Sequence, residues 1–263
     1  MDIINNRCLG SEEQYIKYTS LSISTMTVCF NFNQMIPLNE LKESLSKKTD
    51  IFYNPHSKKS KIPKKKGTDS FYNSFDLKMS VVDTQMNPYI FSNVSVFIFP
   101  NGKVKIAGIK TMNTVHLLID ELIDIITEYS TIKKPLVAEN ILIQMICSDF
   151  KIKPTKEDSD GWCIKQETLK NILVNDYSLS ATFSALSRYP GINVKKKSLF
   201  SENKNISLLI FRSGSIIITG AKNIEDIIDA YNLIVDITRK HYCKLFYFDI
   251  NEEIKQKKKK KLI

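Results

Sequence analysis

Histidine and glycine are scarce in this chain, and each scarcity argues against a class of function. The three histidines, His56, His116 and His241, stand apart from one another and form no H-x-x-x-H or H-E-x-x-H spacing. The eight glycines form no G-x-x-x-x-G-K-[ST], G-x-G-x-x-G or G-x-S-x-G motif, so neither a phosphate-binding loop nor a nucleophile elbow is predicted. We therefore expect no catalytic residues, no cofactor and no metal site.

Paired cysteines and long apolar runs are also missing. The five cysteines are odd in number, scattered and never in a C-x-x-C pair, which predicts neither a disulfide framework nor a zinc site. No apolar run approaches the roughly 18 residues of a membrane helix, and the first residues lack the order of a signal peptide. With 43% hydrophobic and 25% charged residues, the composition is typical of a globular protein. We expect a reducing, aqueous compartment and no membrane partner.

The net charge of +10 is concentrated in two lysine-rich segments. Residues 56–66 and residues 254–263 each hold six lysines and no acidic residue. The remaining 26 basic residues are balanced by 28 acidic ones, so the body of the protein is close to neutral. Two interpretations of the lysine runs stay open: solvated segments that keep the chain soluble, or segments that contact phosphates or direct import.

An internal repeat is the most informative feature of the sequence. Residues 93–110 resemble residues 205–222 at a constant offset of 112, with Ile, Phe, Gly, Gly and Lys recurring without a gap. Each copy has two β-branched runs around a turn with the sequence Pro-Asn-Gly or Arg-Ser-Gly, which predicts a β-hairpin. Apolar residues then recur at three- and four-residue spacing, which predicts a helix after each hairpin, over 114–129 and 224–239.

A similar series precedes each hairpin. Alternating residues predict a strand over 21–32 and another over 137–150, and each is followed by a short helical pattern, over 38–45 and 165–173. Each half is thus predicted as strand, short helix, several strands and long helix. Antiparallel strands with helices on one face give an α+β fold.

The duplicated hairpin resembles the TATA-box-binding protein family. Its pattern, Phe-x-[Ser/Asn]-Gly-x-[Val/Ile]-x-Ile-x-Gly-[Ala/Ile]-Lys, is very close to the family signature in residues 208–222, and the resemblance covers roughly residues 20–242. The chain diverges from this family, has lysine-rich insertions and is rich in Lys, Ile and Asn, as expected from an A·T-rich genome. In these features it resembles a family member encoded by a large cytoplasmic DNA virus. The resemblance implies a saddle in which two pseudo-repeats share a curved antiparallel sheet, with helices on the convex face.

The resemblance also implies a division of the chain. It has an N-terminal extension at 1–20 and a first repeat at 21–130 with a lysine-rich insertion at 56–70. A second repeat at 136–242 precedes a C-terminal extension at 243–263 with a lysine-rich tail.

The function implied by the family is binding of double-stranded DNA in an A·T-rich minor groove. Phenylalanines wedge between base steps and the duplex kinks by about 80°. In the second repeat the corresponding residues are Phe211, Tyr189, Asn140, Leu142, Leu209, Ile217, Thr219 and Lys195. In the first repeat they are Phe99, Phe75, Lys103 and Lys105, where Lys105 replaces a groove-facing valine.

Partners and location follow from the same resemblance. Asp120, Glu121, Asp124 and Glu128 stand where the family has a basic helix, so we expect viral transcription factors or a viral RNA polymerase as partners instead of host factors. The expected location is the host cytoplasm, at the viral factory, with the virion and the nucleus as alternatives. The alternative function is a protein-interaction scaffold of a viral transcription complex whose DNA contacts have decayed.

Overall fold

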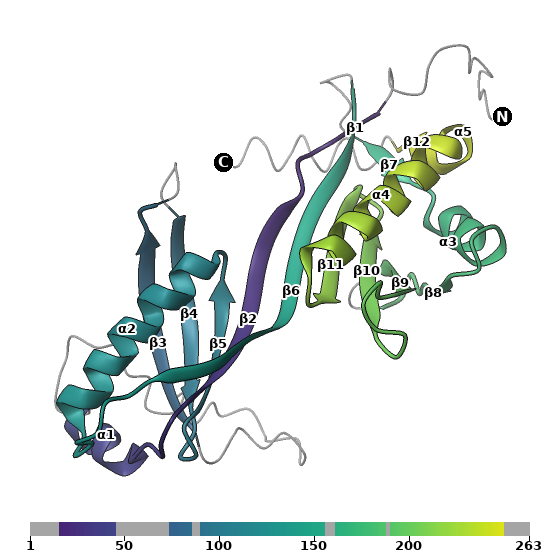
Figure 1. The fold of residues 1–263 in the computed structure, drawn as a ribbon. Helices are drawn as coiled ribbons and strands as arrows, with labels where there is room; N and C mark the ends of the chain where they lie inside the picture. Colours follow the sequence, from purple (N-terminus) through teal and green to yellow (C-terminus); the bar gives the residue numbers. More distant parts are fainter. Residues whose placement is uncertain (1–15, 46–73, 86–89, 156–160, 188–189, 250–263) are drawn as a thin grey trace. The chain divides into compact units, whose positions relative to one another are not determined.

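The computed structural model describes residues 16–45, 74–85, 90–155, 161–187 and 190–249 (Figure 1). It divides into two compact units, a first unit of Ser24–Ile146 and a second unit of Met1–Ile23 with Cys147–Ile263. The boundaries between the units fall inside strands β2 (Ser22–Phe32) and β6 (Ala138–Pro154). Each unit combines an antiparallel sheet with helices, which is the α+β class predicted from the sequence.

The first unit has the strand order β3-β4-β5-β2-β6. Its other elements are α1 (Leu38–Leu45), β3 (Phe75–Asp83), β4 (Ile90–Ile98), β5 (Lys103–Ile109) and α2 (Met112–Tyr129). Helix α2 lies across one face of the sheet and packs against β3 and β5 (Figure 1). The apolar stripe of the helix is completely buried, from Val115 through Leu118 and Leu122 to Ile126.

Strand alternation explains which face of this sheet the helix covers. Val94, Val96 and Ile98 of β4 are buried, whereas the residues between them are half-buried or exposed. Because successive side chains of a strand point to opposite faces, β4 has one apolar face buried beneath the helix and an opposite face that stays open and carries Ser95 and Phe97.

Asp83 joins the end of β3 to the start of α2. Its buried carboxylate accepts hydrogen bonds from Thr111 Oγ1 at 2.5 Å and Asn113 Nδ2 at 2.7 Å. Thr111 is also the N-cap of α2 and accepts from the backbone N of Thr114. The hydrogen bond from Thr111 lowers the pKa of Asp83, so the carboxyl stays ionised and fixes the helix start.

The second unit has the strand order β6-β11-β10-β9-β8, and β1 (Ile16–Tyr18) also pairs with β6. The remaining elements are β7 (Trp162–Ile164), α3 (Gln166–Asn175), β8 (Ser180–Thr182), β9 (Gly191–Lys197), β10 (Asn205–Phe211), β11 (Ser215–Ala221), α4 (Ile224–Lys240), α5 (Tyr242–Leu245) and β12 (Phe246–Phe248). Helix α4 packs on β11, and α3 packs on β8 and β9. As in the first unit, all the large helices lie on one face of the sheet (Figure 1).

The structure confirms both predicted hairpins, as β4–β5 and β10–β11, and the helices that follow them. It adds a two-stranded sheet of β7 and β12, which the sequence analysis did not predict because both strands have only three residues. The sequence indicated no disulfide framework, but Cys243 is disulfide-bonded, whereas Cys29, Cys147 and Cys163 form no disulfide. Within the described part of the chain, no helix is long and apolar enough to span a membrane.

Candidate nucleic-acid interface

Both sheets leave the face opposite their helices open. In β10, Ile206, Leu208 and Ile210 are completely or almost completely buried, whereas Ser207, Leu209 and Phe211 alternate with them and are half-buried. The open faces therefore carry the side chains that can meet a ligand, and most of the predicted site residues lie on them.

Phe99 and Phe211 occupy equivalent positions at the two hairpin turns. The carbonyl of Phe99 accepts a hydrogen bond from the N–H of Gly102, and that of Phe211 accepts from the N–H of Gly214, each at 3.0 Å. The two glycines have φ of +83° and +82°, a conformation that other residues rarely adopt. Both phenylalanines are half-buried, so each turn places an aromatic side chain at the rim of an open face.

Gly191 makes room for the ring of Phe211. The two residues are register partners in β9 and β10, and a Cβ on Gly191 would lie 3.1 Å from a carbon of the Phe211 ring. A larger residue at 191 would displace the ring. The ring is therefore held by packing against the strand next to it.

The turn that carries Phe211 is anchored from outside the hairpin. The backbone N–H of Ile164 donates to the carbonyl of Arg212, and that of Ile152 donates to the carbonyl of Gly214, both at 2.9 Å. The Arg212 side chain forms an ion pair with Asp249 and lies 5.6 Å from the centre of the Tyr247 ring. The C-terminal segment around β12 thus buttresses this turn.

The first unit repeats the backbone part of this arrangement. The N–H of Phe32 donates to the carbonyl of Gly102 at 2.8 Å, and the N–H of Ile36 donates to that of Pro100 at 2.9 Å. Both phenylalanine turns are therefore held at two points by a neighbouring segment of their own unit.

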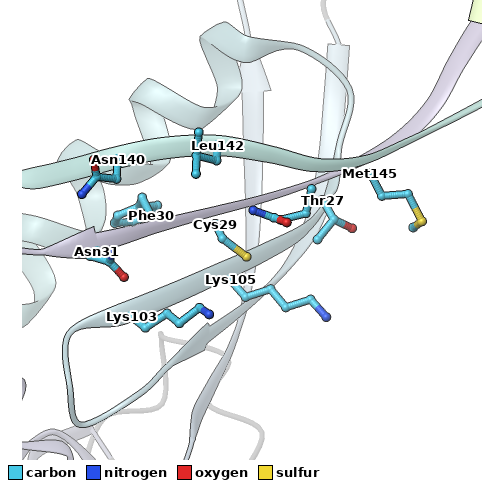
Figure 2. Close-up of a pocket in the computed structure, with 10 residues that line it drawn as sticks. Thr27, Cys29, Phe30, Asn31, Lys103, Lys105, Asn140, Leu142 and Met145 are labelled. Carbon is cyan, nitrogen blue, oxygen red and sulfur yellow. The ribbon is translucent and has the colours of Figure 1, made fainter. Parts of the chain in front are cut away.

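The open face of the first unit is hollowed. A depression of about 440 Å³ lies over β2, β5 and the first half of β6. Figure 2 shows Lys103 and Lys105 extending from one strand beside residues of β2. The residues that line the depression are mostly polar: Thr27, Cys29, Phe30, Asn31, Lys103, Lys105, Asn140, Leu142, Gln144 and Met145.

The structure thus brings four predicted site residues together: Lys103 and Lys105 of the first predicted repeat, and Asn140 and Leu142, which were predicted for the second repeat but lie in the first unit. Leu142 is 58% exposed, so its side chain is accessible at the depression. Asn140 is also exposed and has a φ of +55°, in the left-handed region that asparagine tolerates better than most residues. The lysines and the Asn140–Leu142 pair therefore face the same space.

The open face of the second unit is more apolar at its centre. Leu209 and Ile217 are register partners in β10 and β11 and are half-buried side by side. The next pair along the strands is Ser207 and Thr219, and the Thr219 hydroxyl lies 3.1 Å from the Cys147 sulfur. The predicted site residues Leu209, Ile217 and Thr219 therefore form one continuous surface.

Each unit also has a lysine–serine pair on the open face. The exposed Lys195 donates from Nζ to Ser207 Oγ at 2.6 Å, and Lys78 makes the same contact with Ser95. Ser95 and Ser207 are themselves related by the 112-residue offset. Lys195 was predicted as a phosphate contact, whereas its counterpart Lys78 was missed because only the β3–β4 register reveals it.

For two predicted site residues, Phe75 and Tyr189, the structure gives no position on an open face. Phe75 is only 1% exposed and begins the buried face of β3, so it is a core residue and its prediction as an inserting aromatic was wrong. Tyr189 lies outside the described residues, as do the two lysine runs. Among the residues that the structure does describe, no group of His, Cys, Asp or Glu could hold a metal ion.

The duplicated hairpins, open faces and aromatic turns can be compared with known proteins. Residues 176–241 match the family model described as transcription factor TFIID, or TATA-binding protein. This part of the chain is thus similar to the TATA-binding-protein family.

One protein sequence and one solved structure are similar to this chain. Over 218 residues the chain is 24% identical to the "TATA-box-binding protein-like" protein of Acanthamoeba polyphaga mimivirus. The aligned region covers 74% of this chain and 55% of that protein. The chain thus spans about half the length of that relative. The TATA-binding protein of Methanococcus jannaschii has the same fold, with a TM-score of 0.53 at 16% identity, over 84% of this chain and 99% of the other.

The TATA-binding-protein family consists of DNA-binding transcription factors and not of enzymes, which agrees with the absence of catalytic motifs in the sequence. The matched residues include β8 to β11 and α4, with the Phe211 turn between β10 and β11. The resemblance stated from the hairpin motif is therefore supported by the family match over residues 176–241, and the predicted fold is confirmed.

Proposed function

We propose that this protein is a TATA-binding-protein-like transcription initiation factor that binds double-stranded DNA in the minor groove and bends it at viral promoters. The observation that carries the proposal is the placement of Phe99 and Phe211 at equivalent glycine turns, each at the rim of an open sheet face. A rigid apolar wedge at a strand end is what opens a base step from the minor-groove side.

The open faces carry side chains that can pack against a base step opened by the phenylalanines. Unstacking a base step costs a few kcal/mol, and this cost is offset only when side chains pack against the opened groove. Leu209 and Ile217 offer such an apolar surface in the second unit, and Leu142 offers one in the first. Asn140 donates from its amide to the acceptors at the edge of A·T pairs.

Phosphate contacts are assigned to the lysines at the open faces. Lys195 and Lys196 are adjacent in β9 and point to opposite faces of the strand: Lys195 is exposed beside Ser207, whereas Lys196 forms an ion pair with Asp229 of α4. Only Lys195 is therefore placed to contact DNA. Replacing either lysine with alanine removes one positive charge, so Lys196→Ala is a matched control for Lys195→Ala.

We expect Lys195→Ala to flatten the salt dependence of DNA binding and Lys196→Ala to leave it unchanged. Each phosphate contact contributes about 0.9 to the slope of log K against log salt. The measurement is a gel-shift titration with A·T-rich and G·C-rich duplexes over a series of salt concentrations. Equal slopes for both variants and the wild type would contradict the assignment of Lys195. No binding of the wild type to any duplex would favour the scaffold alternative.

The exposed face of α2 is proposed as the surface for partners. Asp120, Glu121, Asp124 and Glu128 are exposed on this helix, and partial burial raises the pKa of Glu121. A partner with a basic face, such as a viral transcription factor or a viral RNA polymerase, complements this charge. We expect host general transcription factors of the B or A type to bind poorly on DNA that this protein has already bent. A stable ternary complex with either purified factor in a gel-shift assay would overturn this expectation.

The proposed location is the viral factory in the cytoplasm of an infected cell. It is supported by the similarity to a protein of a giant virus. Fluorescence microscopy of the tagged protein during infection tests it, and accumulation confined to the nucleus would contradict it.

A further inference from the structure

The turns that carry Phe99 and Phe211 differ in the residue that follows the phenylalanine. At the offset of 112 residues, Arg212 stands where the first unit has Pro100. Proline fixes its own φ through its ring, whereas arginine has no such constraint. The Arg212 side chain is instead held from outside the hairpin, by its ion pair with Asp249 and by the nearby ring of Tyr247.

Asp249 belongs to a C-terminal segment, residues 242–249, that lies beyond the residues matching the family model. Strand β12 of this segment pairs with β7. The backbone N–H of Asp249 donates to the carbonyl of Gly161 at 2.7 Å, and the ring of Phe246 stacks on that of Trp162 with centroids 4.5 Å apart. The C-terminal segment is therefore fixed to β7, and Arg212 is bound to a rigid support.

The junction between β7 and α3 binds both neighbours of Phe211 in the chain. The backbone N–H of Ile164 donates to the carbonyl of Arg212 at 2.9 Å. The side chain of Gln166, which is only 9% exposed, donates from Nε2 to the carbonyl of Ile210 at 3.2 Å. Because the carbonyls before and after Phe211 are both bound to one junction, the backbone that carries the ring moves with β7.

Gln166 also holds the strand against which the Phe211 ring packs. Its Nε2 donates a second hydrogen bond, to the carbonyl of Pro190 at 2.8 Å. Gly191 follows Pro190 and is the register partner of Phe211. An apolar side chain at 166 would leave both carbonyls without this donor. Gln166 thus joins the strand of the ring to the strand beside it.

A ring that is already held in place loses less conformational entropy when it binds, so preorganisation strengthens binding. We infer that the C-terminal segment holds the Phe211 turn in the position for insertion, with Asp249 and Gln166 as positioning residues that act through Phe211. The inference rests on the proposed minor-groove binding. It assigns to a part of the chain outside the family match a role in aiming one of the two aromatic wedges.

The charge of Asp249 makes the test discriminating. Asp249→Asn removes a negative charge, so a general electrostatic effect would strengthen DNA binding, whereas loss of positioning weakens it. Asp236→Asn, at an exposed position of α4 in the same unit, makes the same charge change and is the matched control. We expect Asp249→Asn to weaken binding to an A·T-rich duplex by about threefold or more and to reduce bending, and Asp236→Asn to do neither.

A double-mutant cycle shows whether the effect passes through the ring. In a Phe211→Ala background, Asp249→Asn should change the affinity by less than about 1.5-fold, because the side chain that it positions is gone. In a Phe99→Ala background it should keep its full effect. Gln166→Met, which replaces the amide with an apolar group of similar length, should follow the same pattern. A merely structural role would lower the affinity equally in both backgrounds.

Hydrogen exchange tests the anchoring of the turn in the absence of DNA. The amide of Gly214, which donates to the carbonyl of Phe211, should exchange faster in Asp249→Asn and Gln166→Met, whereas the amides of α4 should not change. Equal DNA binding by Asp249→Asn and Asp236→Asn, or an undiminished loss in the Phe211→Ala background, would overturn the inference. Unchanged exchange at Gly214 would overturn it as well. Faster exchange at Gly214 in a protein whose wild type binds no duplex would instead contradict the proposed function and leave the anchoring of the turn intact.

Discussion

Phe211→Ala should weaken binding to an A·T-rich duplex by about 5- to 150-fold, the scale of one mismatched base pair at about 1–3 kcal/mol. The ring lies against Gly191 at the end of β10, beside the aliphatic pair Leu209 and Ile217. Its loss removes the wedge while the surface that would fill the opened groove remains. The measurement is affinity by fluorescence titration.

Phe99→Ala should cost less, with a difference on the order of 1 kcal/mol. The surface next to Phe99 is the hollowed, lysine-bearing face, which recovers less packing energy from an opened base step. Phe200→Ala, which removes a 59% exposed ring from the turn between β9 and β10, serves as the control and should have no effect. Equal losses of affinity for Phe99→Ala and Phe211→Ala would contradict the expected difference between the two units. No loss of affinity in either variant, with the fold intact, would contradict the DNA-bending proposal.

Gly214→Ala should destabilise the protein by about 2–5 kcal/mol, from left-handed backbone strain together with a steric clash. Gly214 has a φ of +82°, and a Cβ there would lie 2.4 Å from the carbonyl oxygen of Ile152 and 3.0 Å from the Trp162 ring. Because the obstacle is backbone, the turn itself must shift, and with it Phe211. We therefore expect lower stability in urea unfolding and weaker DNA binding together.

Gly220→Ala is the matched control in the same hairpin. Gly220 has a φ of +88°, but the nearest atom to an added Cβ is 3.6 Å away, which is an ordinary contact. Only the cost of the left-handed conformation remains, about 1–2 kcal/mol. If both variants lost the same stability, the contacts between the turn and the segment around Ile152 would not be what holds it.

The regular part of the fold could be predicted because its signals are local. Alternating β-branched runs around a glycine turn identify the hairpins from β4 to β5 and from β10 to β11, and a three- and four-residue spacing identifies α2 and α4. Phe75 was misassigned although β3 contained the relevant signal. Leu77, Met79 and Val81 follow it at two-residue spacing and share its buried face.

The rest of the site depends on register, which separate segments do not reveal. Lys78 became a counterpart of Lys195 only when β3 was seen paired with β4, which places it beside Ser95. In the same way, Asn140 lies far from Lys105 in the sequence but lines the same depression. The anchoring of the Phe211 turn by Asp249 was not predictable either, because the contact joins two irregular segments.

The most direct test of the DNA-bending proposal is the bend angle of a single duplex. An A·T-rich duplex labelled with a donor and an acceptor dye at its ends reports the end-to-end distance by fluorescence energy transfer. Addition of the wild-type protein should raise the transfer efficiency to a value that corresponds to a kink between about 20° and 90° toward the major groove. Saturating binding with no change in transfer efficiency would contradict the proposed function.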